Sequence, residues 1–117
     1  MATRYEVVLG DDETFFFQLR TADGDVILRS LGSPSKIMTQ NEILHLRNSL
    51  RDESRLVPHE SADGSRFLVI KDSDGSVLAR SAKVGSDDEL ESMAAQLQAA
   101  ASAPMVDLAK VDRTRAG

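Results

Sequence analysis

The chain has 117 residues, of which 41% are hydrophobic, enough for one domain with a modest core. It contains no cysteine, which excludes disulfides, thiolate catalysis and cysteine-ligated zinc. The 14 basic and 19 acidic side chains give a net charge of −5, a balance that does not favour nucleic-acid binding. No apolar run is long enough to span a membrane, and the N-terminal stretch MATRYEVVLG lacks the long apolar segment of a signal peptide, so we expect a cytoplasmic protein.

The first predicted element is a strand over Tyr5 to Leu9, where apolar residues occupy alternate positions. After a polar turn, residues 15–30 (FFFQLRTADGDVILRS) read as two strands closed by Asp23-Gly24. This dipeptide predicts a type I′ loop in which both central residues have positive φ. Such a loop pairs Thr21 with Val26 across the hairpin. The core side of the hairpin is then formed by Phe17, Leu19, Val26 and Leu28.

The hairpin pattern returns in residues 66–81 (RFLVIKDSDGSVLARS), which align with the first copy without a gap. The corresponding core side is formed by Leu68, Ile70, Val77 and Ala79. We therefore predict a tandem repeat, with copies at residues 4–53 and 54–112, fused into one domain over residues 1–112. The polar residues 113–117 are predicted to be a disordered tail.

After each hairpin, apolar residues recur at the spacing of an α-helix. Ser35 is the predicted N-cap of a helix that ends near Asp52, and its apolar face consists of Thr39, Ile43, Leu46 and Leu50. In the second copy, Ser86 to Glu89 reads as a capping box. The apolar face of that helix consists of Leu90, Met93, Ala94 and Leu97.

Two further strands are predicted. The segment from Arg55 to Ser61 links the copies, and Pro58 removes a hydrogen-bond donor from it, so this strand is either short or at an edge of the sheet. After Pro104, which stops the second helix, Met105 to Val111 alternates weakly and is predicted to form the last strand.

Together these motifs carry a family resemblance. An aromatic strand, an Asp-Gly hairpin, ILRS followed by Ser35-Lys36, and Ile43 with LRNS on a helix, all repeated once, resemble the YegP-like family of uncharacterised prokaryotic proteins. The resemblance covers about residues 4 to 112. It implies an α+β fold in which two β-β-β-α-β units share one antiparallel sheet with helices packed on it and exchange their C-terminal strands. Met105 to Val111 would then pair within the other repeat. The family implies no activity.

Catalytic and metal-binding motifs are not found. Asp72 to Ser76 resembles the start of a calcium loop, but Lys83 stands where the bidentate glutamate is required, so we interpret the stretch as a hairpin turn. His45 and His59 are the only histidines, and no acid at a fixed short spacing frames either as a base or a metal ligand. No nucleophile elbow or phosphate loop is present. We expect no enzyme activity, no metal and no cofactor.

The outer face of the predicted sheet is the remaining candidate site. Its basic and aromatic residues are Phe16, Arg20, Arg29, Phe67, Lys71 and Arg80. Such a face, or a free sheet edge, can receive a protein partner, and the function we expect is a non-enzymatic interaction module. The alternative function is binding of an anionic small molecule or of single-stranded nucleic acid by this face. Two other interpretations give this face no binding role. In one, the aliphatic parts of the Arg and Lys side chains merely cover apolar neighbours; in the other, the helices cover this face. As a pseudo-dimer, the chain is expected to be a monomer.

Overall fold

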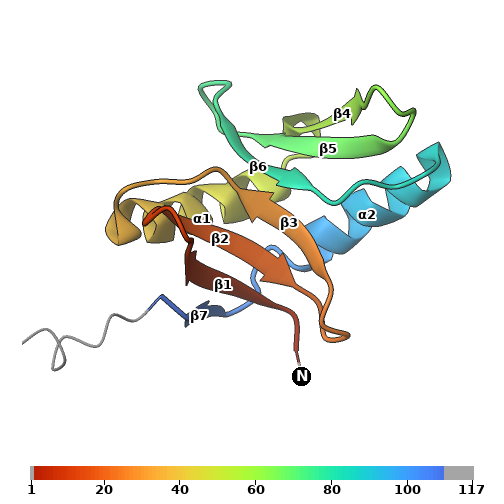
Figure 1. The fold of residues 1–117 in the computed structure, drawn as a ribbon. Coiled ribbons are helices and arrows are strands. Elements are labelled where there is room, and N and C mark those ends of the chain that lie inside the picture. The colour runs from red at the N-terminus through yellow and green to blue at the C-terminus, as the bar shows by residue number, and fades with distance from the viewer. Residues whose placement is uncertain (1, 110–117) are drawn as a thin grey trace, which may run out of the picture.

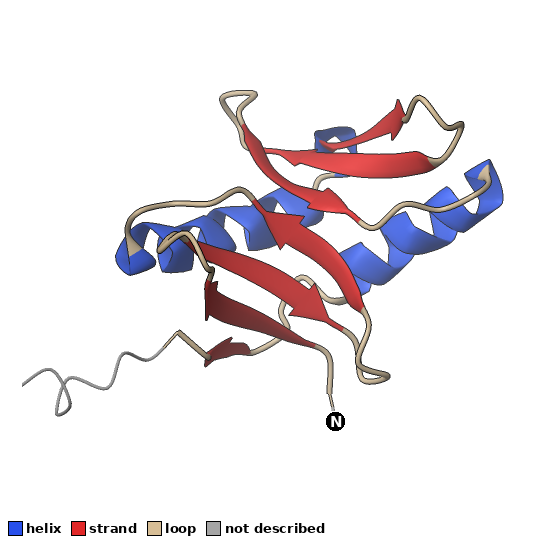
Figure 2. Ribbon diagram, in the orientation of Figure 1, coloured by secondary structure: helices blue, strands red, loops and turns tan. Residues whose placement is uncertain are grey.

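The computed structural model describes residues 2–109, which form an α+β fold with one seven-stranded sheet and two helices (Figures 1 and 2). The predicted tail at residues 113–117 lies outside the described residues. The strands are β1 (Arg4–Leu9), β2 (Phe15–Arg20), β3 (Val26–Ser30), β4 (Leu56–Glu60), β5 (Arg66–Lys71), β6 (Val77–Ser81) and β7 (Met105–Asp107). The helices are α1 (Lys36–Leu50) and α2 (Asp87–Ala99), and a short 3-10 helix, η1 (Glu53–Arg55), precedes β4. Within the described residues, neither helix is long and apolar enough to cross a membrane.

The strand order is β4-β5-β6-β3-β2-β1-β7, so β3 and β6 meet at the centre and join the two halves of the chain into one sheet (Figure 1). All neighbours are antiparallel except β1 and β7, which pair in parallel from Tyr5–Met105 to Val7–Asp107. The sheet is therefore mixed, not wholly antiparallel as predicted. The reason is that the chain reaches β7 through α2, and a helical crossover permits a parallel neighbour whereas a hairpin does not. As the resemblance implies, the last strand pairs with the first half of the chain.

Both helices pack on the same side of the sheet, behind it in Figure 1. The predicted core side faces them: Phe17, Leu19 and Ile70 are fully buried, and Leu28 is 1% exposed. On α1, the predicted apolar residues Thr39, Ile43, Leu46 and Leu50 are all buried. On α2, Leu90, Met93 and Leu97 are buried and Ala94 is half-buried.

The serines predicted to cap the helices do so. Ser35 Oγ accepts a hydrogen bond from the Met38 N–H at the start of α1. Ser86 Oγ accepts one from the Glu89 N–H, which is the first bond of a capping box, and its hydroxyl donates to the Glu89 carboxylate.

The hairpin loop between β2 and β3 differs from the prediction. Gly24 has φ 95° and donates to Thr21 O, while the Thr21 N–H donates to Asp25 O. Asp23 does not have positive φ, so the loop is a three-residue turn with a glycine bulge and not a type I′ turn. The extra residue shifts the register, and Arg20, not Thr21, pairs with Val26. The second copy has the same shift, with Lys71 paired to Val77. Val26 and Val77 are consequently half-buried rather than part of the core.

Candidate functional site: the open face of the sheet

The side of the sheet opposite α1 and α2 carries no helix, and we call it the open face; it is the side toward the viewer in Figure 1. Strand alternation and register determine which side chains project there. These are Arg4, Glu6, Val8, Phe16, Gln18, Arg20, Ile27, Arg29, Val57, His59, Phe67, Val69, Lys71, Leu78 and Arg80. All the candidate residues from the sequence are among them. The reading in which the helices cover this face is wrong.

The centre of the open face is occupied by two arginines. Arg29 of β3 and Arg80 of β6 are direct partners in the antiparallel pair. The nearby hydrogen bond from Ala82 N–H to Ile27 O puts both arginines at hydrogen-bonded positions, where Cα atoms are about 5.5 Å apart. Both side chains are exposed. Like charges directly opposite each other destabilise a sheet, so this arrangement costs stability.

The two arginines are lightly held by their surroundings. The Arg29 guanidinium lies 5.0 Å from the centre of the Phe16 ring, and its Nη2 is 3.4 Å from Gln18 Oε1. The side chain of Arg80 makes no hydrogen bond or ion pair with any residue of the described range 2–109. An open depression of about 300 Å³ adjoins the pair, and it is lined by Val26, Leu28, Arg29, Arg80, Ser81 and Ala82. Both guanidinium groups therefore have donors available to a ligand.

Arg20, by contrast, is already paired. Its Nε donates to Glu6 Oε1 at 2.9 Å, while Arg4 Nε donates to Glu6 Oε2 at 2.9 Å and Gln18 Nε2 to Oε1 at 2.9 Å. Burial of the Glu6 carboxylate opposes its ionisation, but the hydrogen bonds from Gln18 and Arg20 and the charges of both arginines lower its pKa below the ordinary value. Glu6 is thus a satisfied anion that is shared by Arg20 and Arg4, and it forms no ion pair with Arg29 or Arg80.

The aromatic residues of the open face are partly covered. Phe16 lies beneath Arg29, and Phe67 stacks on the imidazole of His59 with ring centres 5.6 Å apart. Lys71 is half-buried at the end of β5. His59 was not among the predicted site residues, because only the pairing of β4 with β5 brings it beside Phe67.

Three apolar residues of the open face are buried. Ile27, Val69 and Leu78 are 6%, 5% and 6% exposed although no helix lies over them. Val69 pairs directly with Arg80, so a basic side chain stands beside it on this face. The open face meets solvent through the exposed side chains of Arg29, Arg80 and His59 and the half-buried side chains of Phe16 and Phe67.

The remaining polar motifs of the chain form turns or isolated contacts. Asp74 Oδ1 accepts hydrogen bonds from both the N–H and the Oγ of Ser76, so the calcium-like stretch is the hairpin turn between β5 and β6. His45 Nδ1 lies 3.5 Å from Asp72 Oδ2, a long-range contact that sequence spacing does not reveal. Residues 2–109 contain no cluster of side chains suited to a metal ion.

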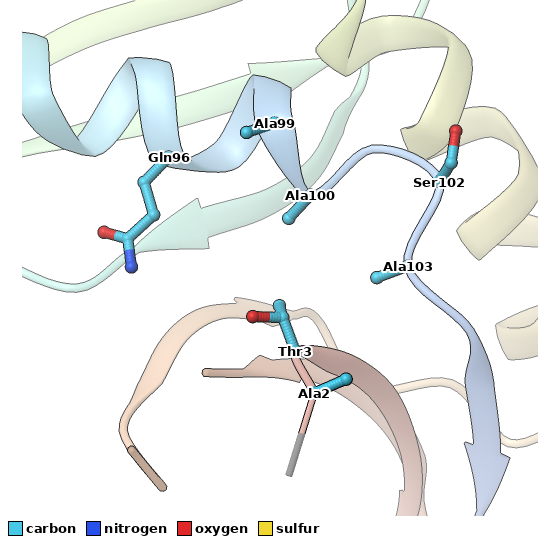
Figure 3. Close-up of a pocket in the computed structure, with 7 residues that line it drawn as sticks. All are labelled: Ala2, Thr3, Gln96, Ala99, Ala100, Ser102 and Ala103. Atoms are coloured by element: carbon cyan, nitrogen blue, oxygen red, sulfur yellow. The ribbon is translucent and has the colours of Figure 1, made fainter. Parts of the chain in front are cut away.

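A second depression lies between the C-terminal end of α2 and the start of the chain (Figure 3). Its volume is about 440 Å³, and it is lined by Ala2, Thr3, Gln96, Ala99, Ala100, Ser102 and Ala103. No ionisable side chain lines it, so it offers no acid, base or charge to a ligand.

The free edge at β4 is blocked at its middle. Leu68 N–H points toward β6, where it donates to Ser81 Oγ, so the backbone of its partner Pro58 points away from β5 and toward the free edge. Proline has no N–H, and the edge therefore lacks a donor at its central position. The prediction that Pro58 marks an edge strand is confirmed.

Two solved structures have a closely similar fold. One is the solution NMR structure of yegP from E. coli, a protein of unknown function, with a TM-score of 0.87, 21% identity and coverage of 96% of this chain and 97% of the other. The other is a UPF0339 protein from Shewanella oneidensis, with a TM-score of 0.85, 19% identity and coverage of 93% of both chains. No protein-family model matches the sequence, and no curated protein does. The chain therefore has the fold of the YegP (UPF0339) proteins of unknown function.

Proposed function

We propose that this protein is a non-enzymatic interaction module whose open face binds a protein partner. The observation that carries the proposal is the pair of exposed, unneutralised arginines, Arg29 and Arg80, at the centre of a sheet face that no helix covers. Like charges directly opposite each other destabilise a sheet, and a bound anionic group of a partner would remove that cost.

The other candidate surfaces are less suited to binding a partner. Pro58 removes the central donor from the β4 edge, so that edge is a poor template for an added strand. The depression beside α2 lacks charged groups. The open face combines cations with the stacked pair of His59 and Phe67, and Arg and aromatic residues are enriched in protein interfaces.

The proposal includes a duplicated, monomeric chain in the cytoplasm. Two matched details support the duplication: Ser30 and Ser81 each accept a backbone hydrogen bond at 2.8 Å from Phe17 and Leu68, and the bridges Phe15–Ser33 and Arg66–Val84 correspond. Two fused copies would already complete one sheet, which favours a monomer. Light scattering and cell fractionation check the oligomeric state and the location.

A pull-down from host lysate tests the function. The tagged full-length protein, Phe16→Ser on the open face, and Leu44→Ser on the exposed side of α1 are compared, with folding checked by circular dichroism. We expect the wild type to capture one host protein in stoichiometric amount, also after nuclease treatment. Leu44→Ser should capture the same amount, whereas Phe16→Ser should capture none or at least about tenfold less. Equal capture by both variants, or no specific protein, contradicts the proposal.

The second candidate function is binding of an anionic small molecule or single-stranded nucleic acid. The stacking of Arg29 on Phe16 favours it, because bases stack on aromatic and guanidinium surfaces. Salt separates the two functions: phosphate binding through Arg and Lys weakens steeply between low and physiological salt, whereas a packed protein interface weakens less. Bound material that disappears with nuclease or salt supports this second function instead.

A further inference from the structure

We propose that Arg29 and Arg80 form a clamp for carboxylate groups, so that the partner presents an acidic segment with side chains at alternate positions of an extended chain. The inference rests on the proposed function and specifies the chemistry of the partner. It is carried by the spacing of the two arginines, by the charge of their surroundings and by the placement of the acidic loops.

The spacing suits two acidic side chains. Arg29 and Arg80 stand on neighbouring strands, which are about 5 Å apart, and residues i and i+2 of an extended chain are about 7 Å apart. A segment lying across the strands can therefore offer one carboxylate to each guanidinium. Each guanidinium can form two parallel hydrogen bonds with a carboxylate, the strongest class of such contacts.

The local charge requires an anion from outside. Among the described strand residues of the open face, Glu6 is the only carboxylate, and Arg4, Arg20 and Gln18 already saturate it. Although the chain carries a net charge of −5, the centre of this face is positive. A carboxylate bound there would relieve the repulsion between Arg29 and Arg80 in addition to pairing with them.

The acidic residues at the ends of the strands argue for a short acidic segment and against a long polyanion. Asp11, Asp12 and Glu13 lie in the loop between β1 and β2, and Asp23 and Asp25 lie between β2 and β3. Asp63 lies between β4 and β5, and Asp72 and Asp74 flank the turn between β5 and β6. A strand of nucleic acid that ran along β3 and β6 past the central pair would approach these carboxylates, whereas a short acidic segment lying across the strands would not.

The test is an NMR titration of the full-length, ¹⁵N-labelled protein with a short acetylated peptide of alternating glutamate and serine. The matched probes are the same peptide with glutamine at every glutamate position and an oligothymidylate of equal length. The variants are Arg29→Ala with Arg80→Ala, and as a control Arg51→Ala with Lys83→Ala, which removes the same charge from exposed residues outside the open face.

We expect the glutamate peptide to shift the amide signals of β3 and β6, and the glutamine peptide to have little effect. Arg29→Ala with Arg80→Ala lowers the affinity about tenfold or more, because the charged hydrogen bonds from both guanidinium groups are lost, and the control pair changes it less than about threefold. Arg29→Lys with Arg80→Lys gives an intermediate loss, because lysine keeps the charge without the planar fork.

Three results overturn the clamp: equal binding of the glutamine peptide, unchanged affinity in the double alanine variant, or tighter binding of the oligothymidylate. The failures of the two proposals are distinguishable. If Phe16→Ser abolishes partner capture but the glutamate peptide does not bind, the interaction module stands and the clamp is wrong. If the peptide binds the arginines but Phe16→Ser leaves capture intact, the open face binds acidic groups without being the partner's interface.

Discussion

Arg29 and Arg80 lie directly opposite each other on the two central strands, both exposed on the face that no helix covers. In the absence of a ligand, this pair should reduce stability. We expect Arg80→Gln to raise the free energy of unfolding by about 0.5 kcal/mol in urea at low salt, because it removes the repulsion. Near 1 M salt the Debye length falls to about 3 Å and the difference should vanish. A variant that is less stable than the wild type at low salt would contradict this reading.

Ser30 and Ser81 fill a gap in the backbone pairing of the central strands. Each Oγ accepts a buried N–H, from Phe17 and Leu68 respectively, at 2.8 Å, and donates to the next carbonyl along the chain. Ser30→Ala and Ser81→Ala should each lower the free energy of unfolding by about 1–2 kcal/mol, since the N–H is left without a partner. Chemical denaturation measures the loss. Ser92→Ala, at an exposed position of α2, is the control and should be neutral or slightly stabilising.

Glu13 occupies a position that suits glycine. It has φ 63°, and its N–H donates to Gly10 O just as the Gly64 N–H donates to Ser61 O in the loop between β4 and β5. Glu13→Gly should raise the free energy of unfolding by about 0.5–1 kcal/mol, because a left-handed conformation costs a side-chain-bearing residue about 1–2 kcal/mol, part of which the flexibility of unfolded glycine offsets.

The reciprocal change provides the control for Glu13. Gly64 has φ 86° and no atom would lie within 4 Å of an added Cβ, so Gly64→Glu isolates backbone strain from crowding. It should lower the melting temperature where Glu13→Gly raises it. Shifts of the same sign in both variants would show that side-chain contacts, not φ, control these loops.

The ionised Glu6 should make stability depend on pH. Its pKa is lowered in the folded protein, so its contribution is complete above the ordinary value of 4.5 and is lost as the pH falls through the folded pKa. Glu6→Gln should cost about 2 kcal/mol at pH 7, where charged hydrogen bonds from Arg4 and Arg20 are lost. Urea denaturation from pH 7 to pH 3 should show this difference shrinking below pH 4.5, with Glu91→Gln, at an exposed position of α2, measured as the matched control. A constant difference would contradict the assignment.

Local patterns predicted most of the elements. Apolar alternation located Phe17, Leu19 and Ile70 on the core side, and Ser35 and Ser86 marked the helix starts, because these signals depend on neighbours a few residues away. The hairpin loop was assigned to the wrong type because Asp-Gly fits both a type I′ turn and a glycine bulge. That one-residue difference moved Val26 out of the core.

The site depends on contacts that no local pattern contains. Alternation predicts that Arg29 and Arg80 share a face, but their direct opposition follows from the pairing of β3 with β6 across the middle of the chain. The neutralisation of Arg20 by Glu6 requires the register of β1 with β2 and the long reach of both side chains. The stacking of His59 on Phe67 likewise depends on the register of β4 with β5.

The most direct test of the open face as the interaction surface is methyl NMR of the full-length protein, labelled at Ile, Leu and Val, in host lysate and in buffer. The open-face methyl groups are those of Val8, Ile27, Val57, Val69 and Leu78, and the exposed methyl groups of Ile37 and Leu44 on α1 report on the opposite side. We predict that lysate broadens or shifts the open-face signals and leaves those of α1 sharp. Changes at Ile37 and Leu44 instead, or no selective change at all, would contradict the account.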